Sequence, residues 1–345
     1  MSGMISKHGD RDAGGFFDVR HFFVINPHSF RRKTDHHKQV LTEIEGCFTG
    51  LHKADYEIYI SRYPRDAVAV IHQYIAAVSG EIVRVYAIGG DGILFDCLNG
   101  MADFPNAELT AVPYGSSNDF VRSFGENALK NFRDIKKLCA ASPLLVDIID
   151  CGANYAINEV AFGVEAQAIL NVNKLLRHPR LKFLHKNVAL VYKLGAFYSV
   201  MNEEVNLQQY QLLLDEEDLS GCFCNISVSN GPCIGGNMVS SPYAKPNDGL
   251  LDAIFTKGGS TLSVASCVGS YTKGHFEKSD MFFRKQFRRM EIKSETPIRV
   301  HLDGESFYTD EIKLKIIPGK IKFCTPEGMD FVDYSYRAYK GKKNE

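Results

Sequence analysis

The sequence lacks the features that define several large classes of protein. Its longest apolar segment, "NVALVYKLGAFYSVM", contains Lys193 and is too short to span a bilayer. The N-terminal residues "MSGMISKHGDRDAGG" are polar and do not contain the apolar core of a signal peptide. The formal net charge is −1, so no overall electric field would attract nucleic acid. We therefore expect a soluble protein that does not bind nucleic acid.

Paired cysteines are also missing. The nine cysteines are odd in number and include no CxxC pair, and Cys222 and Cys224 stand too close in sequence to share a tetrahedral zinc site. Several of the nine lie inside apolar, strand-like runs, where cysteine acts as a small buried hydrophobic residue. This usage is typical of a reducing compartment and predicts a cytoplasmic protein.

The first part of the chain does contain a regular alternation of strands and helices. Each of four apolar or β-branched runs is followed by a turn, and helical spacing follows the first three of these turns. Such an alternation predicts a parallel sheet covered by helices, with its loops gathered at the carboxyl edge. The predicted strands cover residues 22–26, 56–60, 82–88 and 108–113.

From about residue 144 the pattern changes to short strands separated by turn signals, interrupted by helical stretches near 164–201 and 260–273. This pattern predicts a mostly antiparallel β-sandwich as a second domain. A chain of 345 residues is long enough for two domains. The predicted boundaries are a disordered tail over 1–20, an α/β domain over 21–143 that also takes in about 326–345, and a β-rich domain over 144–325.

Four loops follow the predicted strands of the first domain and are rich in Gly, Ser and Asn. Their sequences are "NPHS" (26–29), "SRYP" (61–64), "GGDG" (89–92) and "PYGSSND" (113–119). Such residues present N–H groups and hydroxyls without bulk, and these groups bind phosphate oxygens at the start of a helix. No Walker sequence and no GxGxxG occurs in the chain. We expect a phosphate site of another type at this edge.

Five motifs in series closely resemble the diacylglycerol kinase catalytic domain family, which includes bacterial lipid kinases and sphingosine kinases. They are "NPHS", "GGDG", "PYGSSNDFVRSFG", "GGNMVSSPYAKPNDGLLD" and "HLDGE", and together they cover about residues 20–335. The resemblance implies a first domain like that of NAD kinases and phosphofructokinases. It also implies an ATP- and Mg²⁺-dependent kinase that phosphorylates a lipid hydroxyl, most simply that of diacylglycerol to give phosphatidic acid.

The resemblance also implies roles for individual residues. It assigns ATP contacts to three loops and to the serine that ends the second strand, and it places Mg²⁺ beside the aspartate of "DGLLD" and nearby backbone carbonyls. The implied nucleotide residues are Asn26, Ser61, Gly89, Gly90, Asp91, Gly92, Ser116, Asn118 and Asp119. The implied metal residues are Asp248, Leu251 and Ala253.

A phosphoryl transfer to an alcohol also needs a carboxylate near the acceptor oxygen. The resemblance places Asp303 and Glu305 in the region of this base. The two residues alternate on a strand, so only one of them faces the site. We favour Glu305 slightly, because its longer side chain can reach across a cleft while Asp303 suits a turn. If neither residue is the base, Asp91 is the next candidate.

The chain departs from the family pattern directly after the "GGDG" loop. Ile93, Phe95 and Asp96 stand where the family usually has a hydroxyl, an amide and a glutamate. Two alternatives therefore stay open: a kinase of a soluble alcohol, similar to NAD or sugar kinases, and a nucleotide- or lipid-binding protein with impaired catalysis.

For the lipid kinase, we expect peripheral contact with a membrane surface. Mixed basic and apolar residues over 174–200 and 281–290 are the candidate contact segments. A homodimer is compatible with the sequence but not required by it.

Overall fold

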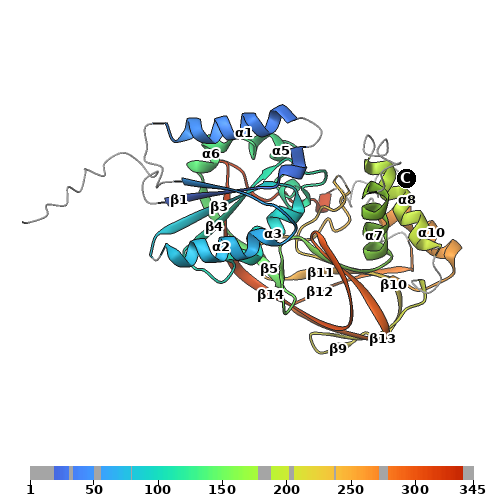
Figure 1. The fold of residues 1–345 in the computed structure, drawn as a ribbon. Coiled ribbons are helices and arrows are strands. Elements are labelled where there is room, and N and C mark those ends of the chain that lie inside the picture. Colours follow the sequence, from blue (N-terminus) through green and yellow to red (C-terminus); the bar gives the residue numbers. More distant parts are fainter. Residues whose placement is uncertain are drawn as a thin grey trace, which may run out of the picture.

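The computed structural model describes residues 19–30, 34–49, 56–78, 80–177, 188–201, 206–236, 238–271 and 279–336 (Figure 1). The predicted tail over 1–20 therefore falls outside the described part, except for its last two residues. Those two residues, Val19 and Arg20, begin the first strand.

The first domain contains a parallel sheet with the strand order β2-β1-β3-β4. Helices cover both faces, with α1 and α6 on one side and α2 and α3 on the other (Figure 1). This covering explains why β3 and β4 are apolar and almost continuously buried. The elements are β1 (Val19–Ile25), η1 (Pro27–Phe30), α1 (Thr34–Cys47), β2 (Tyr56–Ile60), α2 (Asp66–Ala77), β3 (Ile82–Gly89), α3 (Asp91–Met101), β4 (Ala107–Pro113), α4 (Asp119–Arg122), α5 (Ala128–Asn131) and α6 (Ile135–Cys139).

The second domain is mostly antiparallel. Alternate residues of β7, β10, β11 and β13 face a second apolar core that contains Phe162, Val228, Phe255 and Val300. Three helices lie at the upper right of this domain (Figure 1). The elements are β5 (Ser142–Asp150), β6 (Tyr155–Ala156), β7 (Glu159–Gly163), α7 (Val164–Arg177), α8 (Val188–Val200), β8 (Gln209–Leu214), β9 (Glu217–Asp218), β10 (Gly221–Ser229), β11 (Leu251–Lys257), α10 (Thr261–Tyr271), β12 (Phe282–Phe287), β13 (Arg289–Leu302) and β14 (Glu305–Thr325).

The long strand β14 belongs to both domains. Its first part pairs antiparallel with β13, and near its end Lys322 and Phe323 pair in parallel with β4 of the first sheet. The pairing of β14 with β5 shifts register between Ile317 and Ile321, where the chain passes from one domain to the other. Strands of both domains thus form one hydrogen-bonded 14-stranded sheet.

The architecture confirms the predicted fold class, an α/β domain followed by a largely antiparallel β domain. The predicted boundary between residues 143 and 144 falls inside β5, and the boundary at 325–326 falls directly after β14. Because β5 and the end of β14 contribute Val146, Ile148 and Phe323 to the first core, the two domains share a structural border at these strands.

A buried ion pair supports the first sheet next to this border. The Arg84 guanidinium on β3 lies 2.7 Å from the Glu108 carboxylate on β4, and both side chains are less than one-tenth exposed. Arg84 also donates to the backbone oxygens of Leu138 and Cys139 at the end of α6. One guanidinium therefore ties two strands and a helix together.

We expect Glu108→Ala to lower the free energy of unfolding by about 3–5 kcal/mol, because it leaves Arg84 buried without its counter-charge. Glu81→Ala is the matched control, since it removes a half-exposed partner of Arg20 and should cost at most about 1 kcal/mol. Urea unfolding followed by circular dichroism measures both. Equal losses in the two variants would contradict a structural role for the buried pair.

Candidate active site

The carboxyl ends of the parallel strands bring the four predicted loops together. The Asn26 N–H donates to the Ile88 oxygen at 3.0 Å, and the Ser61 N–H donates to the Ile25 oxygen at 2.9 Å. The Gly89 oxygen accepts from the N–H groups of Tyr114 and Gly115 at 2.7 and 2.8 Å. The loops after β1, β2, β3 and β4 are therefore hydrogen-bonded neighbours.

Two glycines allow the closest of these contacts. A Cβ atom on Gly115 would overlap the Cα atom of Gly90, so the two loops meet backbone to backbone. Gly92 is different: it is exposed, and an added Cβ would meet nothing within 4 Å. The fold of the site thus requires Gly90, while Gly92 is exposed on the side to which a Cβ would point.

Asp91 organises the loop after β4. Its two carboxylate oxygens accept the N–H groups of Asn118 and Asp119 at 2.8 and 2.7 Å. The Asn118 side chain braces the same loop by donating to the Gly115 oxygen and accepting from the Gly115 N–H. Asn118 has a φ of 53°, a left-handed conformation that asparagine tolerates better than most residues. Ser116, by contrast, is exposed at the tip of the loop.

Asp119 joins the first domain to a loop of the second. Its oxygens accept the N–H groups of Gly236 and Gly235 at 2.6 and 2.9 Å. Burial raises the pKa of Asp119 well above its usual value, and the nearby charge of Asp91 adds to this rise. The "GGNMV" motif thus supplies backbone donors to a carboxylate of the "SSND" motif.

Asp303 of the second domain also comes near Asp91, whose charge acts on it. Its carboxylate accepts three backbone N–H groups, from Ile157 at 2.6 Å, Asn158 at 3.1 Å and Glu159 at 2.8 Å. Burial raises the pKa of Asp303 to about 7, and the charge of Asp91 also contributes to this rise. Next to it, a Cβ on Gly304 would lie 3.0 Å from the Gly92 Cα, so the "DGE" turn rests directly on the "GGDG" loop.

Glu305 takes a different position. It is half-buried at the first residue of β14, opposite Leu302 of β13. Within the described part of the chain no hydrogen bond holds its carboxylate, and the neighbour that senses its charge is Asp96 on α3. Both "DGE" carboxylates therefore lie near the helix that follows the "GGDG" loop, but backbone hydrogen bonds hold only that of Asp303 among the described residues.

Sequence analysis missed the role of Arg65. This residue has a φ of 71°, and its guanidinium lies 3.2 Å from the Asp96 carboxylate and stacks over the Phe95 ring at 4.6 Å. Burial raises the pKa of Asp96 to about 6, partly offset by Arg65. The departures from the family pattern at positions 95 and 96 thus form one structural unit with Arg65. Ile93 is buried beside Gly89.

The predicted metal residues lie in one segment of the second domain. Asp248 is exposed in the turn before β11, and its carboxylate accepts the Leu250 N–H at 3.0 Å. Leu251 and Ala253 are buried in β11, where Ala253 pairs with strands on both sides. The assignment of Asp248 to metal binding stays a prediction.

Carboxylates dominate the electrostatics where the domains meet. Asp91, Asp119, Glu159 and Asp303 act on one another, and burial is the largest cause of the raised pKa of each. Arg122 is a cation that counters part of this charge at Asp91 and Asp119. Among the described residues, no three His, Cys, Asp or Glu side chains form a ready-made metal centre.

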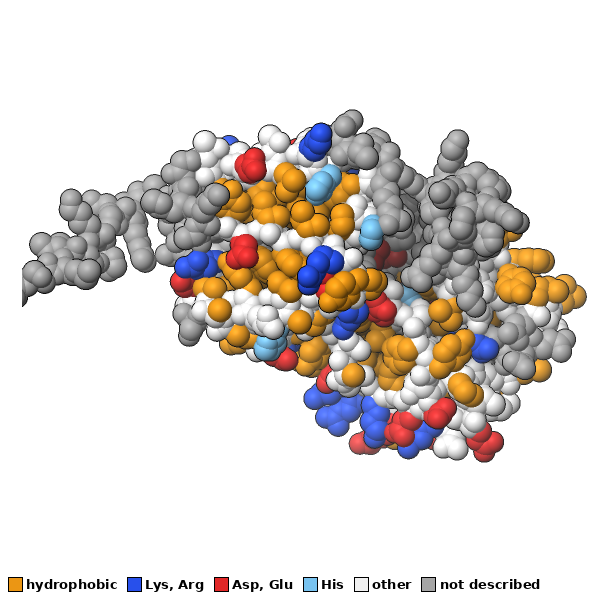
Figure 2. Space-filling view, viewed as in Figure 1, with side chains coloured by type: hydrophobic (Ala, Val, Ile, Leu, Met, Phe, Trp, Pro, Cys, Tyr) orange, Lys and Arg blue, Asp and Glu red, His pale blue; other side chains and the backbone are white. Residues whose placement is uncertain are grey.

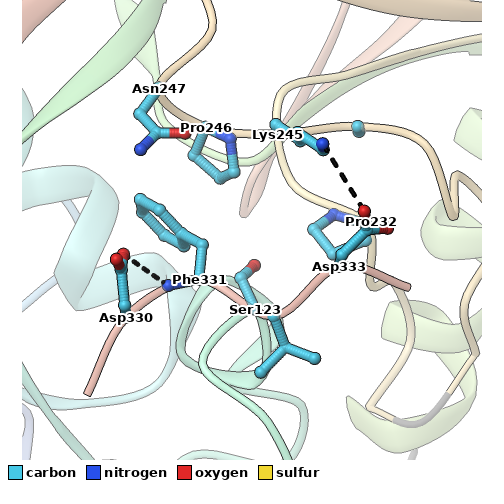
Figure 3. Close-up of a pocket in the computed structure, with 10 residues that line it drawn as sticks. Ser123, Pro232, Lys245, Pro246, Asn247, Asp330, Phe331 and Asp333 are labelled. Carbon is cyan, nitrogen blue, oxygen red and sulfur yellow. Dashed lines mark hydrogen bonds and ion pairs between the residues drawn. The ribbon is translucent and has the colours of Figure 1, made fainter. Parts of the chain in front are cut away.

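A pocket of about 150 Å³ lies beside this site, between Ser123, Pro232, residues 244–247 and residues 330–333 (Figure 3). The C-terminal segment closes it, since the Val332 N–H donates to the Ser123 oxygen at 2.9 Å and the Tyr334 hydroxyl donates to the Arg122 oxygen at 2.8 Å. Lys245 and Asp333 form an ion pair across its rim (Figure 3). None of the predicted site residues lines this pocket.

Two family profiles match the chain. Residues 20–151 match the diacylglycerol kinase catalytic domain. Residues 158–325 match the YegS C-terminal NAD kinase beta sandwich-like domain. The border between the two profiles falls at the strands that connect the two cores.

Relatives and solved structures agree with these profiles. The chain is 26% identical over 321 residues to YtlR of Bacillus subtilis, a candidate lipid kinase, covering 88% of this chain and 99% of the relative. It is 27% identical over 265 residues to a Pseudomonas syringae protein named "Probable lipid kinase YegS-like", covering 76% and 81%.

The fold is similar to that of a crystal structure titled as a diacylglycerol kinase from Bacillus anthracis. The TM-score is 0.64 at 19% identity, covering 90% of this chain and 98% of that one. The motifs, the two profiles and the fold lead to one conclusion: the chain belongs to the diacylglycerol kinase catalytic domain family of lipid kinases.

Proposed function

We propose that this protein transfers the γ-phosphate of ATP, with Mg²⁺, to the hydroxyl of a membrane lipid, diacylglycerol being the simplest acceptor. One observation carries the proposal: the Asp303–Gly304 turn of the second domain rests on the Asp91–Gly92 loop of the first. A carboxylate from one domain thus adjoins the glycine loop of the other. Phosphoryl transfer needs such an arrangement, since it depends on positioning and charge neutralisation.

ATP would bind along the carboxyl edge of the first sheet. Asn26, Ser61 and Ser116 stand there as half-buried or exposed polar residues, and Gly92 at the start of α3 is exposed although the Gly304 turn rests on part of its backbone. The N-terminus of α3 carries free backbone N–H groups and the positive end of the helix dipole, which favour a phosphate. These features support a nucleotide at this edge.

The residues present also fit Mg²⁺. Its usual ligands are one or two carboxylates together with phosphate and water oxygens, so a full protein cage is not required. Asp91 and Asp119 would hold it, because each of their oxygens has a second lone pair beyond its backbone hydrogen bond. The ion would neutralise charge on the transferred phosphoryl group. Asp248, Leu251 and Ala253 remain a second proposed Mg²⁺ position.

Asp303 is better placed than Glu305 to accept the proton of the acceptor hydroxyl. Its three backbone donors fix the carboxylate and occupy three of about four lone-pair positions, which leaves one for the alcohol. A pKa near 7 gives it more basicity than an ordinary aspartate. Glu305 has no comparable support among the described residues. We therefore propose Asp303 as the base.

Exposed apolar side chains on α8 support a lipid as the acceptor. Gly195 packs against Val172 of α7, and another side of α8, continued by Met201 directly after its end, carries an exposed apolar stripe at i, i+3, i+4 and i+7. We call this stripe the α8 face; it consists of Leu194, Phe197, Tyr198 and Met201.

We propose that the α8 face contacts the bilayer that contains the acceptor. Orange side chains gather at the end of the molecule where α8 and α10 lie (Figure 2). No helix in the described ranges is long and apolar enough to cross a membrane, so contact from one side is the arrangement that we propose.

The two segments predicted to contact the membrane differ in the structure. Part of the 174–200 segment lies outside the described residues. The 281–290 segment forms β12 and the start of β13, and its Arg284 pairs with Asp252 and stacks over Tyr243. This pairing makes 281–290 a weaker candidate for membrane contact than the α8 face.

The assignment of the base is tested with amide variants. Asp303→Asn should lower kcat by roughly 10²–10⁴, because it removes proton acceptance from a fixed group, while Glu305→Gln should keep turnover within a few-fold. The assay follows labelled phosphate from ATP into lipid in mixed micelles. A dead Glu305→Gln enzyme beside an active Asp303→Asn enzyme would reverse the assignment. Phosphate transfer to soluble alcohols alone would contradict the lipid acceptor.

The raised pKa of Asp303 predicts a pH dependence. The base must be ionised to accept a proton, so kcat/KM should fall as the pH drops through about 7 and Asp303 takes up a proton. An aspartate with an ordinary pKa would place this fall near pH 4. The Glu305→Gln variant should show the same profile as the unaltered protein. A flat profile between pH 5 and 8 would contradict the assignment.

The α8 face is tested with vesicles. Replacing Phe197 and Tyr198 with Ser should weaken sedimentation with lipid vesicles by at least about tenfold, because two large apolar side chains lose their transfer free energy. Leu145→Ser is the matched control, since that leucine is 59% exposed on β5, away from α8, and should leave binding unchanged. Equal losses in both variants would rule out a specific contact through α8.

A further inference from the structure

The Glu159 carboxylate is buried without a complete set of partners. This residue begins β7 and is 5% exposed, and its Oε2 atom makes no hydrogen bond within the described part of the protein. A carboxylate oxygen in this situation carries a large cost of lost hydration. The cost is recovered if a ligand supplies the missing donor.

A second unpaired polar atom lies next to Glu159. Ser229 of β10 is directly opposite Glu159 in the antiparallel ladder, and its Oγ atom is also buried without a partner. Opposite residues of two adjacent strands place their Cβ atoms about 5 Å apart on the same face of the sheet. Val160 and Val228, the next residues along each strand, face the apolar core instead. The two unpaired atoms therefore share the polar face of the sheet.

This polar face borders the proposed base. The Glu159 N–H donates to the Asp303 carboxylate at 2.8 Å, and the Asp303 N–H donates to the backbone oxygen of Glu159 at 3.2 Å. An acceptor hydroxyl bound to Asp303 would therefore also lie near Glu159. Burial, and then the charges of Glu165, Asp119, Asp303 and Asp91, raise the pKa of Glu159.

Glu165 shows how a neighbouring buried carboxylate is satisfied inside the protein. Its Oε2 accepts the Tyr271 hydroxyl at 2.6 Å and the Asn225 amide at 3.4 Å. Glu159 has no such donors among the described residues, although its own N–H donates to the proposed base. The difference indicates that the partner of Glu159 comes from outside the chain.

We propose that Glu159 and Ser229 form a subsite for a second hydrogen-bond donor of the acceptor, a hydroxyl or ammonium group on the carbon next to the phosphorylated hydroxyl. The proposal rests on the proposed kinase function and deepens it. Diacylglycerol has one free hydroxyl and would leave this subsite without its donor. The preferred lipid would instead be a long-chain diol, a monoacylglycerol or an amino alcohol.

Three acceptors of equal chain length separate these cases: 1,2-hexadecanediol, 2-amino-1-hexadecanol and 1-hexadecanol, each in detergent micelles with labelled ATP. The unaltered protein should show a kcat/KM for the diol or the amino alcohol between about 10- and 10²-fold above that for the plain alcohol, because only these two supply the donor. The better of the two identifies hydroxyl or ammonium as the preferred group. Equal values for all three would overturn the proposal.

Two variants test the residue itself. Glu159→Ala should reduce the ratio of kcat/KM for the diol or the amino alcohol to kcat/KM for the plain alcohol to near one. Glu159→Gln keeps an acceptor oxygen without charge, so it should lower the amino alcohol value more than the diol value. Glu165→Gln is the matched control and should leave the ratios unchanged, because Tyr271 and Asn225 already bind that carboxylate.

The remaining outcomes are also decisive. A Glu159→Ala enzyme that loses activity equally on all acceptors would show a structural role and overturn the proposal. A shifted Mg²⁺ titration in Glu159→Gln with unchanged acceptor ratios would assign the residue to metal binding instead. No phosphorylation of any acceptor by the unaltered protein would contradict the kinase function, which is a separate failure. Thermal unfolding of Glu159→Gln should occur at a temperature no lower than that of the unaltered protein, since no internal hydrogen bond of Oε2 is lost and a buried charge is removed.

Discussion

The pairing of β14 with both β13 and β4 is the interaction on which the site depends. One continuous strand is hydrogen-bonded into the antiparallel sheet at its start and into the parallel sheet at its end. Glu305, its first residue, follows the Asp303–Gly304 turn, so the register of β14 also sets where this turn meets the Asp91–Gly92 loop. A slip of one residue would move every side chain of the strand to the opposite face.

Backbone N–H groups, rather than side-chain cations, hold the carboxylates at this meeting point. Asp91, Asp119 and Asp303 together accept seven such groups, from loops in both domains. Amide donors lower the pKa of each carboxylate, but burial raises it more, so these groups take up protons more readily than exposed aspartates. A bound cation or an added hydrogen-bond donor would favour their charged form, which agrees with the proposed Mg²⁺ and with the donor proposed for Glu159.

The departures from the family pattern have a physical explanation that leaves the nucleotide edge intact. Phe95 faces the second core, and Asp96 binds Arg65 from the loop after β2. The side chains at these positions therefore support packing and the position of the second loop.

The sequence by itself determined the order of elements and the residues that follow each strand. Hydrophobic periodicity and glycine-rich loops are local signals, so they predicted the parallel sheet, the antiparallel second domain and the loops of Asn26, Ser61, Gly89–Gly92 and Ser116–Asp119. Only the tertiary structure showed the three backbone donors of Asp303, on which its proposal as the base rests, and only it revealed Glu159 and Arg65. Their surroundings come from segments far apart in the chain, and burial and hydrogen bonding between such segments leave no periodic trace in the sequence.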